Sequence, residues 1–133
     1  MELSIGQVAE RTGLSVHALR FYEREGLLVG PVERTATGRR VYTEWDVEWL
    51  RNCTKFRASG MPLADIRRFA ELVGRGPGNE DERLELLREH QRRVVDRIAE
   101  LQDCLGLIDN KVAVYEQHVA QGTAHALWAA PDR

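Results

Sequence analysis

The sequence predicts a mainly α-helical fold in which a winged helix-turn-helix head precedes one long dimerisation helix. Three observations predict it. Two short capped segments are joined by a tight glycine turn, an arginine-bearing hairpin follows them, and a heptad pattern then continues almost to the end of the chain. We place the head at residues 1–75, the dimerisation helix at 79–120 and a short flexible tail at 121–133.

The composition is typical of a folded domain. Apolar residues make up 43% of the chain and charged residues 30%, which allows a core and argues against general disorder. The chain has no run of 18 apolar residues and no signal pattern, so we expect a cytoplasmic protein that does not enter the membrane. Residues 1–75 hold 12 Lys/Arg against 10 Asp/Glu, a balance of +2, whereas residues 76–133 hold 7 against 11, a balance of −4. A face for nucleic acid is therefore expected in the head.

The head begins with two short helices. Ser4 and Gln7 have the spacing of a capping box, and Gly13 can end the first helix in a left-handed conformation. Ser15 caps the second helix, which stops at Gly26. Two short helices joined by such a turn are typical of a helix-turn-helix.

The second helix presents the side chains that we expect to contact DNA. His17, near its start, is placed to reach a base edge, while Arg20 and Arg24 suit phosphate or guanine. The alternative is a solvated basic face paired with Glu23 and Glu25. The residues predicted to face DNA from this helix are Ser15, Val16, His17, Arg20, Tyr22 and Arg24. For Tyr22 we expect the ring in the core and the hydroxyl toward a phosphate.

A hairpin follows the second helix. Residues 32–34 and 40–42 flank a loop in which Gly38 can take the positive φ that the turn needs. Arg39 and Arg40 then lie on a protruding edge, where they can hold phosphate. The alternative is a charged edge that prevents aggregation.

Two further helices complete the predicted head. Thr43 and Asp46 form another capping box, Gly60 ends the third helix, and Pro62 fits the first position of the fourth. Arg57 is expected to extend the phosphate contact, and Arg67 and Arg68 either extend it or are solvated. After the glycine-rich break at 74–78, Asn79 is expected to cap the long helix, with Glu82 at the box position.

The long helix carries a seam sustained over five heptads, with Gln91 its one polar member before the end. A single apolar stripe of this length needs a second helix to cover it, most simply from another copy of the chain. The seam residues are Leu84, Leu87, Gln91, Val94, Ile98, Leu101, Leu105, Ile108, Val112, Tyr115 and Val119.

The N-terminal two-thirds resembles the MerR family of bacterial transcription regulators. The resemblance rests on the segments at 5–9, 13–15, 19–27, 38–43 and 60–63, whose order and spacing agree with the family, together with the long helix. It implies a homodimer with an antiparallel coiled coil that binds double-stranded promoter DNA at a pseudo-palindrome. It also implies that the activated dimer distorts an overlong spacer so that RNA polymerase engages both promoter elements.

The resemblance assigns roles to individual residues as well. His17 is expected to approach bases, whereas Arg20, Tyr22, Arg40 and Tyr42 are expected to hold the DNA backbone. One departure is Arg39, which stands where many members carry an aromatic residue.

The effector is the open question at the level of sequence. No cysteine follows Cys104, so we expect no metal and no cofactor, and no residue set suits an enzyme. The short chain resembles the branch that responds to aldehydes or thiol stress through a lone cysteine, here Cys53. Arg51 and Lys55 nearby can favour its thiolate; the alternative is a buried, inert cysteine. Two other interpretations stay open: a regulator of the same fold that responds to a small-molecule ligand, or a coiled-coil adaptor that binds protein.

Overall fold

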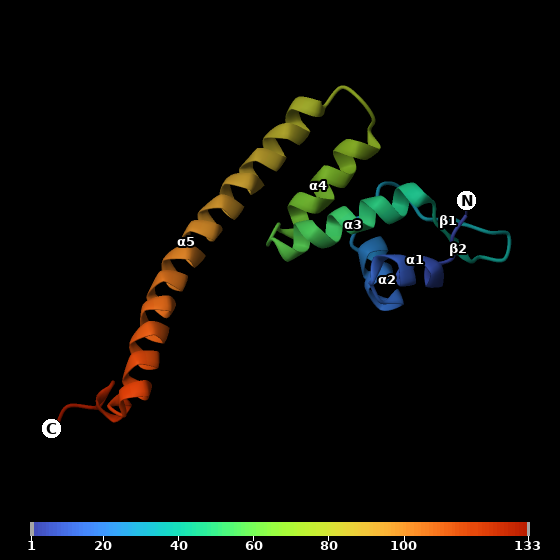
Figure 1. The fold of residues 1–133 in the computed structure, drawn as a ribbon. Coiled ribbons are helices and arrows are strands. Elements are labelled where there is room, and N and C mark those ends of the chain that lie inside the picture. The colour runs from blue at the N-terminus through green and yellow to red at the C-terminus, as the bar shows by residue number, and fades with distance from the viewer. Residues whose placement is uncertain (1, 133) are drawn as a thin grey trace. The chain divides into compact units, whose positions relative to one another are not determined.

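The computed structural model describes residues 2–132 and contains five α-helices, a two-stranded hairpin and one short 3-10 helix within them. Two compact units divide the chain, one up to Gln91 and one from Arg92 onward. The first unit holds α1 (Ile5–Thr12), α2 (Val16–Arg24), β1 (Glu33–Arg34), β2 (Arg40–Val41), α3 (Glu44–Ala58), α4 (Leu63–Gly74) and the start of α5 (Glu80–Gln121) (Figure 1). The predicted mainly α-helical class, with a helix-turn-helix and a wing, is confirmed.

The caps predicted for α1 and α2 are present. Ser4 Oγ accepts from the Gln7 backbone N–H, and the Gln7 side chain accepts from the Ser4 N–H, which completes the capping box. Gly13 ends α1 at φ 74°, a conformation that costs a side-chain-bearing residue free energy. Ser15 then accepts from the Ala18 N–H and starts α2. These local contacts set the tight turn between the two helices.

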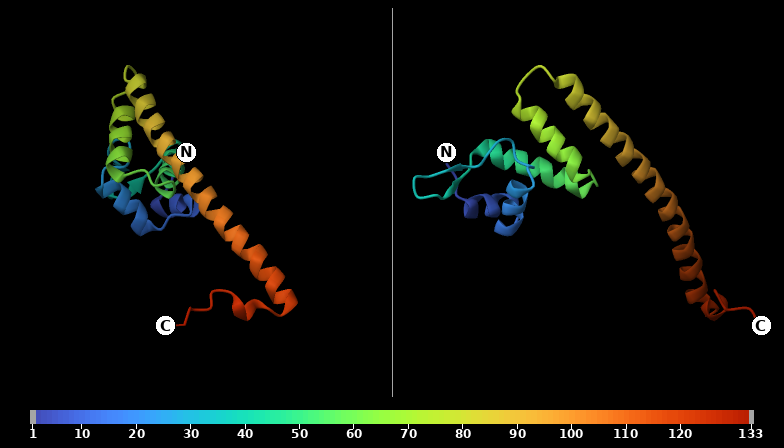
Figure 2. Two further views of the ribbon diagram at one scale, coloured as in Figure 1. Left: turned by 90° about the vertical axis from the view of Figure 1, so that its left-hand side faces the viewer. Right: turned by 180° about the vertical axis from the view of Figure 1, so that it is seen from behind.

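The hairpin forms as predicted, with the antiparallel register Glu33 to Val41 and Arg34 to Arg40. Its loop turns at Gly38, which has φ 85°. The strands are too short to be stable alone. Paired backbone hydrogen bonds of 2.8 Å join Leu3 to Tyr42 at the base of the hairpin and so connect the wing to the N-terminal segment. Figure 2 shows the N-terminal end of the chain beside the hairpin.

The core of the first unit lies between the helices. Leu19, Leu27, Leu50 and Ile66 are at most 1% exposed and come from four separate segments. An aromatic stack continues this core, since Trp49 lies between Trp45 and Phe69 with ring centroids 5.9 and 5.7 Å apart. Other members of the buried cluster are Leu3, Val8, Tyr22, Tyr42, Val47, Trp49, Cys53, Met61 and Ala70.

Two predicted caps differ from the structure. Pro62 precedes α4 as its N-cap, one residue before the predicted position, and its fixed φ of −58° suits either place. Asn79 does not form a box with Glu82. Its amide donates to the Leu72 carbonyl and its side-chain oxygen accepts from Arg83, so Asn79 joins the end of α4 to the start of α5. Glu82 instead binds Arg68.

The start of α5 belongs to the first unit because its residues pack on the head core. Leu86 lies against the buried cluster, and His90 is 7% exposed. The His90 ring lies 2.8 Å from Ser59 Oγ at the end of α3.

The second unit consists of residues 92–121 of α5 and the segment that follows. Gly122 has φ 73°, and a 3-10 helix follows at Ala124–Ala126. Lys111 Nζ lies 5.1 Å from the Trp128 ring centroid, so part of the segment predicted to be a flexible tail folds against the helix. Among the described residues, no helix is both long and apolar enough to cross a bilayer.

Candidate nucleic-acid interface

The outer face of α2 presents most of the residues predicted to contact DNA. Ser15, His17, Arg20 and Arg24 are exposed, and Val16 is half-buried. The opposite face of α2 is anchored in the core through Leu19 and Tyr22, each about 1% exposed. Helical spacing therefore separates the two faces of α2, and the outer one is polar and mostly cationic.

Arg24 and Arg57 enclose an aromatic side chain next to this face. The Arg24 and Arg57 guanidinium carbons lie 5.8 and 5.4 Å from the Phe21 ring centroid. Arg57 also stacks over the Tyr22 ring at 5.5 Å, and its Nη1 donates to the Tyr22 hydroxyl at 3.4 Å. These contacts bring Arg57 of α3 to the same aromatic ring as Arg24 of α2, and the phosphate contact expected of Arg57 stays a prediction.

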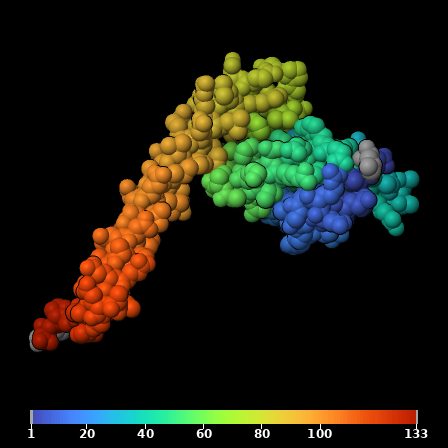
Figure 3. Space-filling view, in the orientation of Figure 1, coloured from blue at the N-terminus to red at the C-terminus, as the bar shows by residue number. Residues whose placement is uncertain are grey.

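The wing adds three arginines. Arg39 is exposed, and Arg40 is half-buried because its Nε donates to Glu23 Oε1 of α2 at 2.5 Å. That hydrogen bond raises the pKa of Arg40. Arg34 lies within 3.7 Å of Glu23 Oε2, and its Nη1 donates to the Gly38 carbonyl at 2.9 Å. In Figure 3 the wing protrudes from the edge of the head unit.

Tyr42 departs from the prediction that its hydroxyl holds the DNA backbone, whereas the buried ring predicted for Tyr22 is confirmed. Both residues are 1% exposed, so their rings form part of the core. The Tyr42 hydroxyl has no hydrogen-bond partner among the described residues, and burial, followed by the charge of Glu23, raises its pKa. A phosphate contact requires a hydroxyl at the surface, which Tyr42 does not offer in this conformation. The Tyr22 hydroxyl accepts from Arg57, and its phosphate contact stays a prediction.

Arg67 and Arg68 are engaged in contacts within the head. Arg67 Nε donates to the Glu25 carbonyl at 2.7 Å, which satisfies an acceptor at the C-terminal end of α2. Arg68 binds Glu71 and Glu82 and so links α4 to the start of α5. These roles favour a structural function for both residues over an extended phosphate contact.

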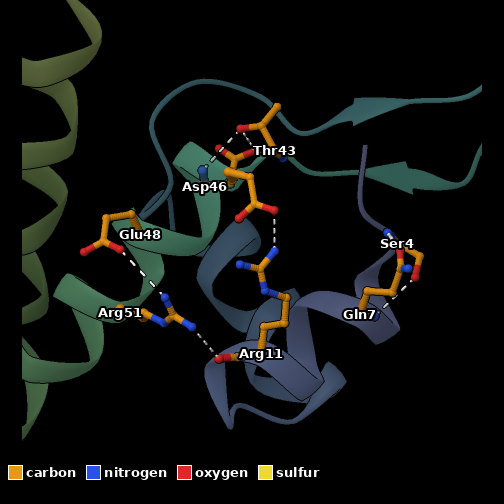
Figure 4. A network of polar contacts seen from close by, with 8 residues as sticks. Ser4, Gln7, Arg11, Thr43, Asp46, Glu48 and Arg51 are labelled. Carbon is orange, nitrogen blue, oxygen red and sulfur yellow. Dashed lines mark hydrogen bonds and ion pairs between the residues drawn. The ribbon is translucent and has the colours of Figure 1, made fainter. Parts of the chain in front are cut away.

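Polar contacts hold α1 against α3 and so fix the helix-turn-helix (Figure 4). Arg11 of α1 binds Glu44 of α3, and this pairing lowers the pKa of Glu44. Arg51 of α3 donates to the Arg11 carbonyl at 3.1 Å and lies 3.8 Å from Glu48. At the start of α3, Thr43 and Asp46 form the predicted capping box.

Cys53 lies in the core, which opposes the expectation that nearby cations favour its thiolate. The side chain is 0% exposed, and its thiol points at the Leu27 carbonyl, 3.9 Å away. Burial raises the pKa of Cys53 to about 12. Arg51 and Lys55, two residues away on either side, lie on the exposed surface of α3, so helical geometry turns them away from the thiol.

The chain matches known proteins over almost its whole length. Residues 3–72 match the MerR HTH family of regulatory proteins, and residues 47–110 match the DNA-binding region described for MerR. An HTH-type transcriptional regulator of Haemophilus influenzae is 38% identical over 127 residues, which cover 96% of this chain and 93% of the relative. The chain belongs to the MerR family.

Solved MerR structures agree with this assignment. HiNmlR, a MerR family regulator lacking the sensor domain and bound to promoter DNA, is 37% identical, with a TM-score of 0.84 over 96% of this chain and all of that one. A putative MerR family regulator from Listeria monocytogenes is 27% identical, with a TM-score of 0.85 over 92% of each chain. The protein is thus a MerR-type DNA-binding transcriptional regulator, a class that is not enzymatic.

Sequence reasoning missed three residues of this MerR head: Phe21, Glu23 as a wing contact, and Arg34. The signal for Arg34 was available, because a hairpin whose loop spans residues 35–39 pairs Arg34 with Arg40. Two arginines directly opposite each other repel, so a nearby carboxylate is expected to offset their charges. The identity of that carboxylate, Glu23, depends on how α2 packs beside the wing.

Proposed function

We propose that the protein binds a pseudo-palindromic promoter site as a homodimer and controls transcription by distorting the DNA between its half-sites, where RNA polymerase binds. The observation that carries the proposal is the set of exposed cations on α2 and the wing, next to His17 at the start of α2. Helix α2 would enter the major groove, and Arg20, Arg24, Arg39, Arg40 and Arg57 would contact phosphate or guanine.

The dimer is supported by the apolar side of α5 in the second unit. Ile98, Leu101 and Leu105 are 50–55% exposed in the single chain, which is unusual for side chains of this size repeated along one helix. The same stripe continues through Ile108, Val112 and Tyr115. An antiparallel second copy would cover it and would place the two heads on successive turns of one face of the DNA. The seam residues that we assign to the homodimer are Leu84, Leu87, Val94, Ile98, Leu101, Leu105, Ile108, Val112 and Tyr115.

Binding to a duplex from the promoter of the protein's own gene tests the proposal. Arg40→Ala should weaken binding to specific and to random duplexes and reduce the slope of log K against log salt by about 0.9, as expected when one phosphate contact is lost. His17→Ala should weaken the specific complex more than the random one. Fluorescence anisotropy at several salt concentrations measures both quantities.

A matched control is Arg75→Ala, which removes one positive charge from the exposed end of α4. It should leave both affinities nearly unchanged. If His17→Ala weakens binding to specific and to random DNA equally, His17 does not read the base sequence. Failure of the wild-type protein to bind any duplex at modest salt would instead favour an adaptor that binds protein.

A response to aldehydes or thiol oxidants through Cys53 is the second candidate function. The thiol lies next to the Leu27 carbonyl, directly after the C-terminal end of α2, and the Trp49 indole donates to that same carbonyl at 2.8 Å. Added atoms at Cys53 would therefore press on the segment that joins α2 to the wing. Because the thiol is buried, such a reaction needs local opening of the core first.

A further inference from the structure

The strand register of the wing places two like charges side by side. Arg34 and Arg40 are direct cross-strand partners, and opposed like charges destabilise a sheet. Glu23 reaches them from α2 and uses both carboxylate oxygens, Oε1 toward Arg40 Nε at 2.5 Å and Oε2 toward Arg34 Nη2 at 3.7 Å. One carboxylate thus offsets the repulsion between two guanidinium groups.

The three side chains are placed where solvent screens their charges only in part. The side chains of Arg40, Glu23 and Arg34 are 23%, 26% and 46% exposed. Ion pairs in such surroundings are held more firmly than fully exposed ones. Glu23 follows Tyr22, whose ring is buried, so its backbone is fixed by the core and its carboxylate has little freedom to move. The carboxylate therefore couples the position of the wing to that of α2.

Binding to Glu23 orients the Arg40 guanidinium without using all of its donors. An arginine has five N–H donors, and the contact with Glu23 uses the one on Nε. The four N–H groups on the two Nη atoms can still form the paired hydrogen bonds that phosphate accepts. Arg34 is likewise held from two sides, by Glu23 and by the Gly38 carbonyl.

We propose that Glu23 is a positioning residue that holds Arg34 and Arg40 of the wing in register with α2, and that Arg34 is a further phosphate-binding residue. The inference rests on the proposed function as a DNA-binding regulator. Its benefit is preorganisation, because the wing arginines lose less conformational freedom when they meet the DNA backbone. Phosphate contacts fix the register of a protein on the duplex, so their geometry matters most in the specific complex.

The measurement that tests this role is the ratio of specific to random-duplex affinity for Glu23→Gln in the full-length protein. The variant removes a negative charge near DNA, so its affinity for random duplex should rise and its salt slope should become steeper by about 0.9. Specific affinity should fall or stay level, so the ratio should drop about tenfold. A merely structural role would lower both affinities, and a merely electrostatic role would raise both by the same factor.

Glu25→Gln is the matched control. Glu25 lies on the same helix, carries the same charge and also binds an arginine, but that arginine is Arg67 of α4 and not a wing residue. It should leave the ratio within about twofold of the wild-type value. In the double variant Arg34→Ala/Arg40→Ala, adding Glu23→Gln should leave the ratio unchanged, because the residues that Glu23 positions are then absent.

Arg34→Ala provides an independent readout. It should weaken binding to all duplexes and make the salt slope shallower by about 0.9. The inference is overturned if wild type discriminates between duplexes but Glu23→Gln scales both affinities equally, or if Arg34→Ala leaves the salt slope unaltered. Wild type that binds no duplex would defeat the proposed function itself, and this inference with it. Circular dichroism of each variant checks that the helices are intact.

Discussion

Cys53 shows how burial decides the chemistry of a single residue. Two cations lie within two residues of it in the sequence, yet its pKa is raised to about 12 because the thiol is desolvated in the core. The neutral thiol therefore predominates at physiological pH, and neither Arg51 nor Lys55 faces it. A sensor built on this cysteine would be controlled by access to the core and not by a permanently reactive thiolate.

The raised pKa predicts how stability changes at alkaline pH. An unfolded cysteine titrates near about 8.5, so a folded pKa of about 12 stabilises the protein fully below about pH 8.5, and this contribution is lost as pH rises toward 12. Between pH 8 and pH 10, wild type should lose about 1–2 kcal/mol more of its free energy of unfolding than Cys53→Ala. Urea denaturation of both proteins at the two pH values measures the difference.

The same experiment has an internal check. Cys104 is exposed and should behave alike in both proteins, so it cancels from the comparison. If the free energy of unfolding has the same pH dependence in wild type and Cys53→Ala, the Cys53 thiol ionises in the folded state. That result would support a sensor in which the Cys53 thiolate reacts directly.

Among the elements, α3 is the one on which the rest of the head is assembled. Its N-terminal end carries the Thr43–Asp46 capping box, its middle supplies Trp49, Leu50 and Cys53 to the core, and Arg57 near its end stacks beside the candidate interface. A helix that begins one residue late would rotate all of these side chains. The cap therefore fixes the phase of the helix as well as its stability.

Thr43→Ala should lower the free energy of unfolding by about 1 kcal/mol, because the N–H of Asp46 loses its side-chain acceptor. Thr37→Ala, in the exposed wing loop, is the matched control and should change it by less than about 0.5 kcal/mol. Thermal or urea unfolding compares the two variants. Equal effects would show that the box adds no more than any exposed threonine.

For the whole molecule, the question is what covers the apolar side of residues 92–121. The 30 residues make about 45 Å of helix, and the side chains that repeat along it stay about half exposed in a single chain. A second copy is the simplest cover, since identical stripes can meet around a two-fold axis. Function at a two-part DNA site would follow from the same symmetry.

Leu101→Glu should convert the proposed homodimer to monomer, because it buries a charge in the centre of the seam. Ala99→Glu, which lies two residues away on the other side of the helix, should leave the dimer intact. Sedimentation velocity reports the mass of each protein. An unchanged dimeric mass for Leu101→Glu would show that the seam is not the interface.

The sequence by itself determined the features that depend on neighbours along the chain. The capping boxes at Ser4 and Thr43, the left-handed turn at Gly13 and the hairpin around Gly38 all follow from local hydrogen bonding and allowed φ values. The family was indicated by the resemblance of the segments at 5–9, 13–15, 19–27, 38–43 and 60–63, with the long helix, to the MerR pattern. Helical periodicity also separated the polar face of α2 from its buried face.

Only the tertiary structure decided features that depend on residues far apart in the sequence. In the folded head Tyr42 and Cys53 are buried, and Glu23 forms ion pairs with both Arg34 and Arg40 of the wing. Arg67 donates to the Glu25 carbonyl at the end of α2, and Asn79 donates to the Leu72 carbonyl. Burial and charge pairing depend on which surfaces meet when the helices pack. The pattern of neighbouring residues does not specify which surfaces pack together, because several partners for each of these groups are equally compatible with its local structure.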